Sequence, residues 1–513
     1  MEASRCSVSA SGWASQRSSR GHGKPERKNI TSSLPRRGRT MARARLQLLD
    51  EEDIRAIDEA SRILLYHTGI EVRSNRAREI LEAMGARASI GSPRVRIPDR
   101  TISSALDRFP RRVLLGSRDG NHDVPIPNGR SHVTTDGCGV NIRDLETGRR
   151  RPSTTKDLAE LTRIADALEA VEVQWPMCVA GDVPTEVHNL VEGAATLENT
   201  TKNVQAEAVA ESDAQALVSM AAAIMGGAEE LRRRPVLSSI QCPVSPLILE
   251  AGSTDALIVF ARAGVPVAPM SMVLMGGSSP VEMASTLVTA NAENLASLCV
   301  SEGAAAGAPV IYSTSCGPID MRSGSFATGS PESAILDAAG VGLARHYGLP
   351  CIVGGFGGDP DDIGFQGGAE KMGSGLLPML AGADLIAGIG GLETDGAVSA
   401  EALVLDADLV DYTRKIIEGI RVDPDTLHLD MLSRVGPGGN FLRERHTLMN
   451  FRTALWSPRI LLREGYLEGT TPEGRIRERA KARAREILAT HVPPPLDKDV
   501  RKAVWNMAKR PID

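Results

Sequence analysis

The chain contains 513 residues, of which 42% are hydrophobic, 24% are charged and only 3% are aromatic. This length excludes a small disulfide-stapled domain, and the composition is typical of a soluble α/β enzyme whose core is built from aliphatic side chains around 50 glycines. The net charge of −5 argues against a nucleic-acid partner, which needs a basic surface, and the absence of any run of about 18 uncharged apolar residues argues against a membrane span.

Residues 1–40 differ in kind from the rest of the chain. They hold nine Lys and Arg against two Glu, a balance of +7, which leaves −12 for the remaining residues. Apolar residues are sparse there, and the apolar core of a secretory signal is missing. We predict a disordered basic extension over residues 1–40, with a transit peptide or a translation start at Met41 as alternatives.

Residues 41–130 are expected to form an N-terminal cap. Apolar positions recur at helical spacing from residue 54 to residue 64, and Asn75 opens a second predicted helix. Residues 86–130 alternate short apolar runs with Pro and Gly. The pattern indicates two helices, then strands and loops that precede the main domain.

From residue 131 the chain alternates between predicted strands and helices, after a hairpin expected near His132 and Asp136. The expected strands are 171–178, 203–209, 236–241, 265–270, 310–314, 351–355 and 385–388. The expected helices are 153–168 (opened by Ser153 with Asp157), one ending at Leu190, 213–225, 255–263, 280–304, 331–347 and 369–381. Seven such units plus the hairpin favour a (β/α)8 TIM barrel over residues 131–420, rather than an open doubly wound sheet. Residues 421–513 are predicted to be a C-terminal helical extension.

Candidate binding residues lie at the carboxyl ends of the predicted strands, where barrel enzymes place their active sites. Glu207 interrupts an apolar strand, and a buried carboxylate needs a partner or a bound cation. Gln205 shares its face by strand alternation, and Gln241 occupies an equivalent strand end. The aromatic rings of Tyr312 and Phe356 could hold a quaternary ammonium cation. These five residues are the predicted substrate-binding set, with core packing as the alternative for the two aromatics.

Glycines cluster after two late strands. The residues concerned are Gly355, Gly357, Gly358, Gly390 and Gly391. They match neither the dinucleotide fingerprint nor the phosphate-binding P-loop, and the chain has no zinc-protease helix and no serine-hydrolase elbow. Glycines here are expected to let the backbone turn tightly and to let a bulky ligand or partner approach.

The seven cysteines form no CxxC pair. An odd number without paired spacing is typical of reduced thiols in the cytoplasm, and neither a disulfide framework nor a zinc site is predicted. Cys242, Cys316 and Cys351 could still converge if their strands were neighbours, although a small thiol in a strand is usually core filling. No metal is expected.

Four stretches of the sequence match motifs of a known family: TKNVQAEAV (201–209), IYSTSCGPIDMRSGSFATGSP (311–331), YGLPCIVGGFGGDPDD (347–362) and GPGGNFLRERHT (436–447). Over residues 45–490 the chain resembles the trimethylamine:corrinoid methyltransferase family. The last stretch, with Phe441, Leu442, His446 and Thr447, is its most specific motif.

The resemblance implies a (β/α)8 barrel that moves a methyl group from a methylated amine to the cobalt of a separate corrinoid protein. The founding members carry pyrrolysine, but this sequence has none, and the matching position is expected near residues 355–358. Members without pyrrolysine are similar to betaine methyltransferases. The chain also lacks the DxHxxG cobalamin signature, so no tightly bound cofactor is expected, and the glycine loops are predicted to face the partner's corrinoid.

The absence of pyrrolysine favours a quaternary amine such as a betaine, because its leaving group is a neutral tertiary amine that needs no protonation. The sequence assigns no catalytic residue and leaves both the amine and a homo-oligomer open. Two other functions are alternatives: a barrel that binds a quaternary amine or a corrinoid protein without catalysis, and a cysteine-activated or metal-dependent barrel enzyme.

Overall fold

A computed structural model describes residues 41–42, 45–89 and 91–509, so the predicted extension over residues 1–40 lies outside the described residues. The chain divides into two compact units. Of the described residues, the larger unit comprises 45–89, 91–419 and 452–509, and the smaller comprises 41–42 and 420–451. Within the described part of the chain, no helix has the length and apolar character needed to cross a bilayer.

The larger unit is built on a closed barrel of eight parallel strands, which confirms the predicted (β/α)8 fold. In chain order the strands are β7 (His132–Thr135), β10 (Val173–Gln174), β11 (Asn203–Ala206), β12 (Leu237–Gln241), β14 (Val267–Ser271), β16 (Tyr312–Thr314), β18 (Cys351–Val353) and β19 (Leu385–Ile389). β7 comes from the expected hairpin and adds to the seven predicted strands to make eight. The barrel closes where Leu385 of β19 pairs with His132 of β7.

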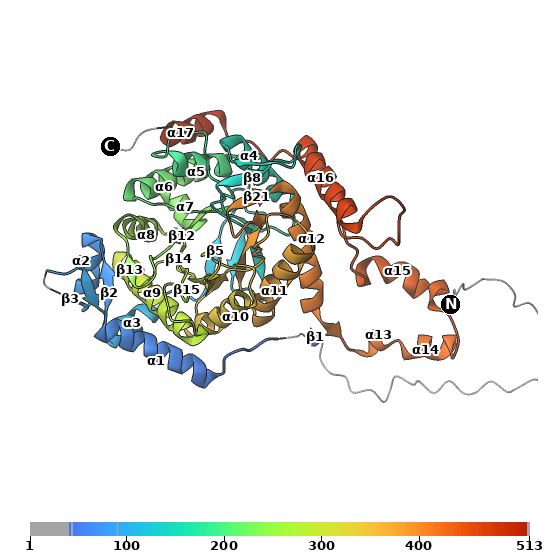
Figure 1. Ribbon diagram of the computed structural model, residues 1–513, viewed down its shortest axis with the longest axis horizontal. Coiled ribbons are helices and arrows are strands. Elements are labelled where there is room, and N and C mark those ends of the chain that lie inside the picture. Colours follow the sequence, from blue (N-terminus) through green and yellow to red (C-terminus); the bar gives the residue numbers. More distant parts are fainter. Residues whose placement is uncertain (1–40, 43–44, 90, 510–513) are drawn as a thin grey trace, which may run out of the picture. The chain divides into compact units, whose positions relative to one another are not determined.

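Helices surround the barrel, as Figure 1 shows. They are α4 (Thr155–Ala167), α5 (His188–Asn199), α6 (Glu211–Met225), α7 (Ala228–Arg233), α8 (Ala251–Ala263), α9 (Met283–Ala304), α10 (Pro331–His346), α11 (Phe365–Ala381) and α12 (Ala400–Glu418). Each crossover helix covers the outer face of the parallel strands, so most strand residues are buried on both sides.

Two predicted helix boundaries are wrong. Thr154, not Ser153, caps α4, because its hydroxyl accepts from the backbone N–H of Asp157 while the Asp157 side chain accepts from the backbone N–H of Thr154. The helix expected to end at Leu190 is α5, which begins only at His188. Asp182 instead accepts from the backbone N–H of Thr155, 2.7 Å away, and so is committed to the start of α4.

The N-terminal segment precedes the barrel, and its last two strands lie at the amino-terminal end of the barrel strands. It contains α1 (Glu51–His67), β2 (Ile70–Val72), α2 (Asn75–Ala83), β3 (Arg87–Ala88), β4 (Arg94–Arg96), α3 (Asp99–Leu106), β5 (Val113–Leu115) and β6 (Val124–Ile126). The β5–β6 hairpin packs its apolar side chains against the barrel interior. Asn203, the first residue of β11, donates to the Gly116 carbonyl at 3.1 Å, which puts the hairpin at the amino-terminal end of the strands.

Short strands extend the loops at the other end. β8 (Asn141–Arg143) and β9 (Arg150–Pro152) follow β7, and β20 (Gly391–Leu392) and β21 (Ala397–Ser399) follow β19; the four form one small sheet. β15 (Leu274–Met275) pairs with β17 (Gly317–Pro318), and β13 (Ile248–Leu249) pairs with β2.

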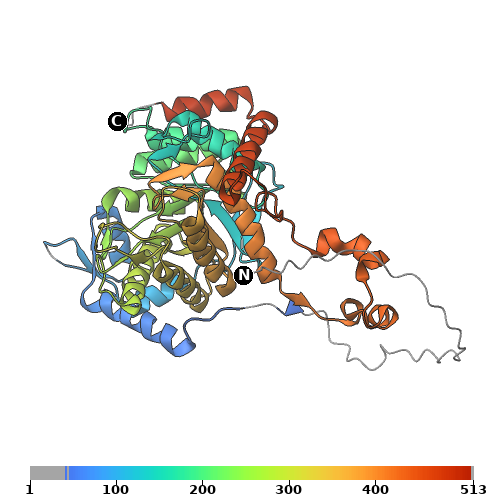
Figure 2. The ribbon, with the colours of Figure 1, turned by 45° about the vertical axis from the view of Figure 1, so that its right-hand side comes forward.

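Two C-terminal helices, α16 (Pro472–Thr490) and α17 (Lys498–Ala508), pack on the outer helices α12, α4, α5 and α6. In Figure 2 these red helices lie along the teal and green ones. Arg163 of α4 donates to the carbonyls of Leu488 and His491, at 2.8 and 2.7 Å, and so ties α16 to the barrel's helical layer.

The smaller unit pairs β1 (Met41–Ala42) with β22 (Ile420–Arg421) in an antiparallel ladder. Its other elements are α13 (Pro424–Leu427), α14 (Leu429–Val435), the 3-10 helix η2 (Phe441–Arg443) and most of α15 (Arg445–Ala454). Helical structure in residues 421–513 is therefore divided between the two units.

Candidate active site at the carboxyl end of the barrel

The strand register determines which side chains enter the barrel, because paired residues on neighbouring strands share a face. Val173, Ile240, Met270 and Ile352 belong to the interior apolar cluster. By contrast, Val204 and Ala206 of β11 pack in the outer cluster between strands and helices. Since strand residues alternate, Gln205 and Glu207 face the interior.

The residues that follow the strands form what we call the barrel mouth: Cys138, Trp175, Glu207, Cys242, Met272 and Ser315. Cys138 is exposed, and the other five residues are partly exposed. The strand residue that directly precedes each of these five is buried. Trp175, Cys242 and Met272 also pack against the interior apolar cluster. The mouth therefore combines an indole, two thiols, a thioether, a hydroxyl and one carboxyl group where barrel enzymes bind substrate.

Glu207 is the titratable centre of the mouth. Its pKa is raised to about 7, chiefly by burial and in smaller part by the Glu192 charge, while hydrogen bonds with the Cys138 thiol and the Trp175 indole oppose the rise. No Lys, Arg or His of the described chain contributes to the shift. Near neutral pH this carboxyl group is poised between its neutral and ionised forms, and a bound cation would favour the ionised form.

The two thiols beside Glu207 are poor nucleophiles. Although Cys138 has an exposed fraction, the atoms packed around both thiols desolvate them, which is the main cause that raises the pKa of Cys138 and Cys242 well above the usual value; the Glu207 charge adds to the rise for both. Thiolates are the reactive form of cysteine. The pair therefore supplies soft, neutral walls instead of an activated nucleophile.

Trp175 lies against the glycine that follows Asp136. A Cβ atom on Gly137 would meet the indole ring at 2.3 Å, so only glycine allows the ring to occupy this position. The Trp175 backbone is held by Thr135, whose hydroxyl accepts from the Trp175 N–H and donates to the Trp175 carbonyl. The ring orientation is thus determined by the end of β7.

A second acidic group lies beside the mouth, where Asp136 and Asp395 are hydrogen-bonded through their carboxyl groups. Burial raises the pKa of both groups, and for Asp136 the Asp395 charge adds to the rise. Asp395 lies in the turn between β20 and β21 with Glu393 and Thr394, and all three have left-handed φ angles of 63°, 54° and 52°. Three such non-glycine residues in succession are strained, which is common at functional sites.

Lys371 of α11 holds together the two loops that carry the predicted corrinoid-facing glycines. Its ammonium donates to the carbonyls of Phe356 and Gly391, at 3.1 and 2.9 Å, and to the Asp406 carboxylate at 2.7 Å. Gly357, Gly358, Gly390 and Gly391 are buried, and Gly355 is half-buried. These glycines serve close packing: a Cβ on Gly391 would lie 1.8 Å from Asp136 Oδ2.

Of the predicted substrate-binding residues, the structure brings only Gln205 and Glu207 together. Gln241 shares the outward face of β12 with Ser239, to whose hydroxyl it donates at 2.9 Å. Tyr312 packs among the outer helices and donates to Asn291 Oδ1 at 3.0 Å. The fully buried Phe356 packs on Gly375 of α11. These three side chains do not line the barrel interior, because the pleat turns Gln241 and Tyr312 outward and a left-handed φ of 48° redirects Phe356.

Sequence reasoning missed Trp175, Cys138, Cys242 and Met272 as mouth residues. A signal was available for Trp175, Cys242 and Met272, because each continues the inward phase of a predicted strand toward or beyond its carboxyl end. Asp395 had no such signal, since its approach to Asp136 depends on the turn that follows β20.

No group of three or more His, Cys, Asp or Glu in the described residues has the geometry to hold a metal ion. The three cysteines whose convergence was considered have different surroundings. Cys242 lies beside Glu207, Cys316 donates to the Ser271 carbonyl, and Cys351 donates to Asp384. The described cysteines are all free.

The C-terminal motif lies in the smaller unit. Thr447 Oγ1 donates to the Phe441 carbonyl at 2.7 Å, and the His446 ring stacks edge-on against His428 with ring centroids 4.2 Å apart. Phe441 and Leu442 are exposed, Leu442 by 80%. The motif is therefore a folded turn that presents apolar side chains on its surface.

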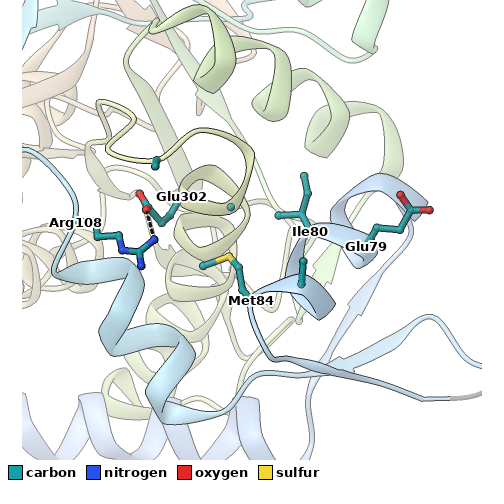
Figure 3. Close-up of a pocket in the computed structure, with 8 residues that line it drawn as sticks. Glu79, Ile80, Met84, Arg108 and Glu302 are labelled. Atoms are coloured by element: carbon teal, nitrogen blue, oxygen red, sulfur yellow. Dashed lines mark hydrogen bonds and ion pairs between the residues drawn. The ribbon is translucent and has the colours of Figure 1, made fainter.

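A cavity of about 460 Å³ lies away from the mouth, between α2 and the end of α9. Figure 3 shows Ile80 and Met84 on one side and the Arg108–Glu302 ion pair, 3.4 Å long, on the other. Because α9 leads into the start of β16, this cavity is at the amino-terminal end of the strands. It contains no convergent reactive groups among the described residues, so we assign the candidate site to the mouth.

Comparisons with known proteins agree over nearly the whole chain. A family model described as trimethylamine methyltransferase (MTTB) matches residues 14–511. Trimethylamine methyltransferase MttB of Desulfitobacterium hafniense (strain DSM 10664 / DCB-2) is 31% identical over 465 residues, which cover 90% of this chain and 93% of that protein. MttB of Methanosarcina thermophila is 33% identical over 468 residues, covering 89% and 96%. A glycine betaine methyltransferase of D. hafniense (strain Y51) is 30% identical over 455 residues, covering 88% and 94%.

Proposed function

Because the chain belongs to the trimethylamine methyltransferase family, we propose that it transfers a methyl group from a quaternary ammonium compound to the cobalt(I) of a separate corrinoid protein. The observation that carries the proposal is the pair formed by Glu207 and Trp175 at the barrel mouth. A carboxyl group and an indole side by side, in the presence of soft neutral walls, are suited to a methylated ammonium cation.

The chemistry requires positioning more than proton transfer. Cobalt(I) supplies an electron pair to the methyl carbon, the carbon–nitrogen bond breaks, and its electron pair stays on nitrogen as a neutral tertiary amine. No proton is needed for a quaternary substrate. This suits a sequence without pyrrolysine. It also suits mouth residues whose one carboxyl group, Glu207, balances the charge of the substrate and does not have to protonate the leaving amine.

The protein's contribution is to hold the cation and to exclude water. Trp175 offers a ring face, which attracts a cation by about 0.5–2 kcal/mol when water is excluded. Glu207 loses its proton when a cation binds next to it, because an adjacent positive charge favours the carboxylate. Met272 and Cys242 complete an apolar surround for the methyl groups.

The corrinoid belongs to the partner protein and is the methyl acceptor. We assign its approach to the loops that carry Gly355, Gly357, Gly358, Gly390 and Gly391. Support comes from their close packing, with Gly388 so near the Gly355 carbonyl that a Cβ would lie 2.0 Å from it. The cytoplasm is the proposed compartment, because cobalt(I) requires reducing conditions.

The test combines the purified full chain, cob(I)alamin and one amine at a time, and follows methylcobalt formation by absorbance. The quaternary amines tested are choline, tetramethylammonium and glycine betaine; we expect product with at least one of them and none with trimethylamine. A zinc chelator should leave the rate unchanged. Turnover of trimethylamine without turnover of any quaternary amine would refute the proposal, and binding without methylcobalt would favour a non-catalytic barrel.

A further inference from the structure

Among the inward positions of the described barrel strands, the one ionisable side chain is His132, at the amino-terminal end, whose ring lies 3.5 Å from the Glu172 carboxylate. The register places one connected set of residues on the inner face: His132, Thr134, Val173, Asn203, Gln205, Ser238, Ile240, Ala268, Met270, Ser313, Ile352, Leu385 and Ala387. Within the eight described strands, no inward position carries Lys, Arg, Asp or Glu. His132 is the first residue of β7, at the end of the barrel opposite the mouth, and its ring lies 2.9 Å from the Asn128 side chain.

Gln205 is one of four inward side chains that have a polar atom without a hydrogen-bond partner in the described chain, with His132 Nδ1, Thr134 Oγ1 and Ser313 Oγ, and it is the one amide among the four. Its side chain is fully buried, and neither the amide oxygen nor the amide nitrogen is hydrogen-bonded within the described chain. Its neighbour Ser238 is committed to Asn203 at 2.7 Å. Leaving a buried amide unpaired costs about 1–3 kcal/mol, so the amide is available to a ligand that can both donate and accept.

Gln205 lies two residues below Glu207 on the same face of β11, about 7 Å deeper in the barrel at the usual rise per residue. The reacting methyl group must point out of the mouth, because a corrinoid is too bulky to enter between the strands. The substituent opposite that methyl group then extends inward, from Glu207 toward Gln205. The depth of about 7 Å between Glu207 and Gln205 matches a substituent of two or three atoms beyond nitrogen together with its hydrogen bond to Gln205.

Resting on the proposed function, we propose that the substrate is a quaternary ammonium compound whose inward substituent ends in an uncharged hydrogen-bonding group, such as a hydroxyl, and that Gln205 recognises it. A choline-like alcohol has this chemistry. A substrate carboxylate does not fit, because it would be buried without a cation and would be close to the Glu207 carboxylate.

The proposal can be tested by ligand binding, without any corrinoid. Choline, tetramethylammonium and glycine betaine are titrated into the full chain by calorimetry at pH 8. We expect choline to bind at least tenfold more tightly than glycine betaine. Gln205→Leu should weaken choline binding about tenfold and change tetramethylammonium binding less than twofold, because only choline has the hydroxyl group.

Gln174→Leu is the matched control. Gln174 is also a buried glutamine, one strand away, but its amide faces outward and donates to Thr162 O and Thr200 Oγ1 at 3.2 and 2.8 Å. The Gln174→Leu variant should be less stable than the wild type and should keep the wild-type ratio of choline affinity to tetramethylammonium affinity. Gln205→Leu should be at least as stable as the wild type, since it removes an unpaired buried amide.

Three results would overturn the proposal: glycine betaine binding as tightly as choline, a Gln205→Leu variant with an unchanged affinity ratio, or no binding of any of the three cations. Failure of the proposed function is a separate outcome. In that case choline would bind with the expected dependence on Gln205, but no methylcobalt would form with cob(I)alamin.

Discussion

Lys371 Nζ lies 2.7 Å from Asp406 Oδ2, and both side chains are buried. The pair joins α11 to α12, and the same Asp406 oxygen accepts from the Gly390 N–H at 2.8 Å. Together with the bonds from Lys371 to the Phe356 and Gly391 carbonyls, it links the loops after β18 and β19. One ion pair thus maintains one side of the rim.

Lys371→Met should therefore lower the free energy of unfolding by about 3–5 kcal/mol, because it leaves a buried carboxylate without its cation. The control is Lys415→Met, which removes a solvent-exposed pair with Glu418 and should cost less than about 1 kcal/mol. Urea denaturation measures both. Equal losses for the two variants would mean that the buried pair does not hold the loops.

Two glycines of α11 should respond in opposite directions to alanine. A Cβ atom on Gly373 would meet no atom of the described residues outside its own helix backbone within 4 Å, whereas a Cβ on Gly375 would lie 2.5 Å from the Phe356 ring. Gly373→Ala should stabilise by about 0.5–1 kcal/mol through helix propensity. Gly375→Ala should destabilise by about 1–3 kcal/mol through overpacking. Thermal unfolding of the two variants side by side checks this.

Glu207 should make stability depend on pH in a predictable direction. Its folded pKa of about 7 is above its ordinary value of 4.5, so the fold disfavours the ionised form. This penalty is absent below pH 4.5, grows as pH rises toward 7 and is complete above that. Glu207→Gln should thus raise the melting temperature at pH 8 and leave it unchanged at pH 4. A gain of the same size at both pH values would contradict the assignment.

The same group should make cation binding pH-dependent. The titratable groups facing it are the Cys138 and Cys242 thiols and Glu192, which pairs with His188 at 3.0 Å. The thiols stay neutral below pH 9, so Glu207 controls the change near pH 7. Affinity for tetramethylammonium should rise about tenfold from pH 6 to pH 8, and this rise should disappear in Glu207→Gln.

Trp175 should contribute to affinity through its ring. Trp175→Leu should weaken tetramethylammonium binding about three- to tenfold, within the range of about 0.5–2 kcal/mol for a cation over an aromatic face. Trp175→Phe keeps a ring and should recover part of the loss. If Trp175→Leu and Trp175→Phe bound tetramethylammonium with equal affinity, Trp175 would contribute only by filling space and not through its aromatic ring.

The order of elements was predictable from local pattern. Apolar runs of strand length, separated by helices with recognisable starts such as Ser330–Pro331, require a parallel sheet with both faces covered, and eight of them close into a barrel. The inward position of Glu207 was also predictable, because Val204, Ala206 and Ala208 mark the outer phase of its strand.

Tertiary structure alone decided which other side chains share that space. Gln241 and Tyr312 end or begin apolar strands as Glu207 does, but the phase of a strand buried on both faces cannot be read from its composition, since both faces are apolar. The position of Trp175 depends on Gly137 from another strand, and the Asp136–Asp395 contact joins residues 259 positions apart through a strained turn. Such contacts depend on register and loop geometry between distant segments, which one-dimensional periodicity does not encode.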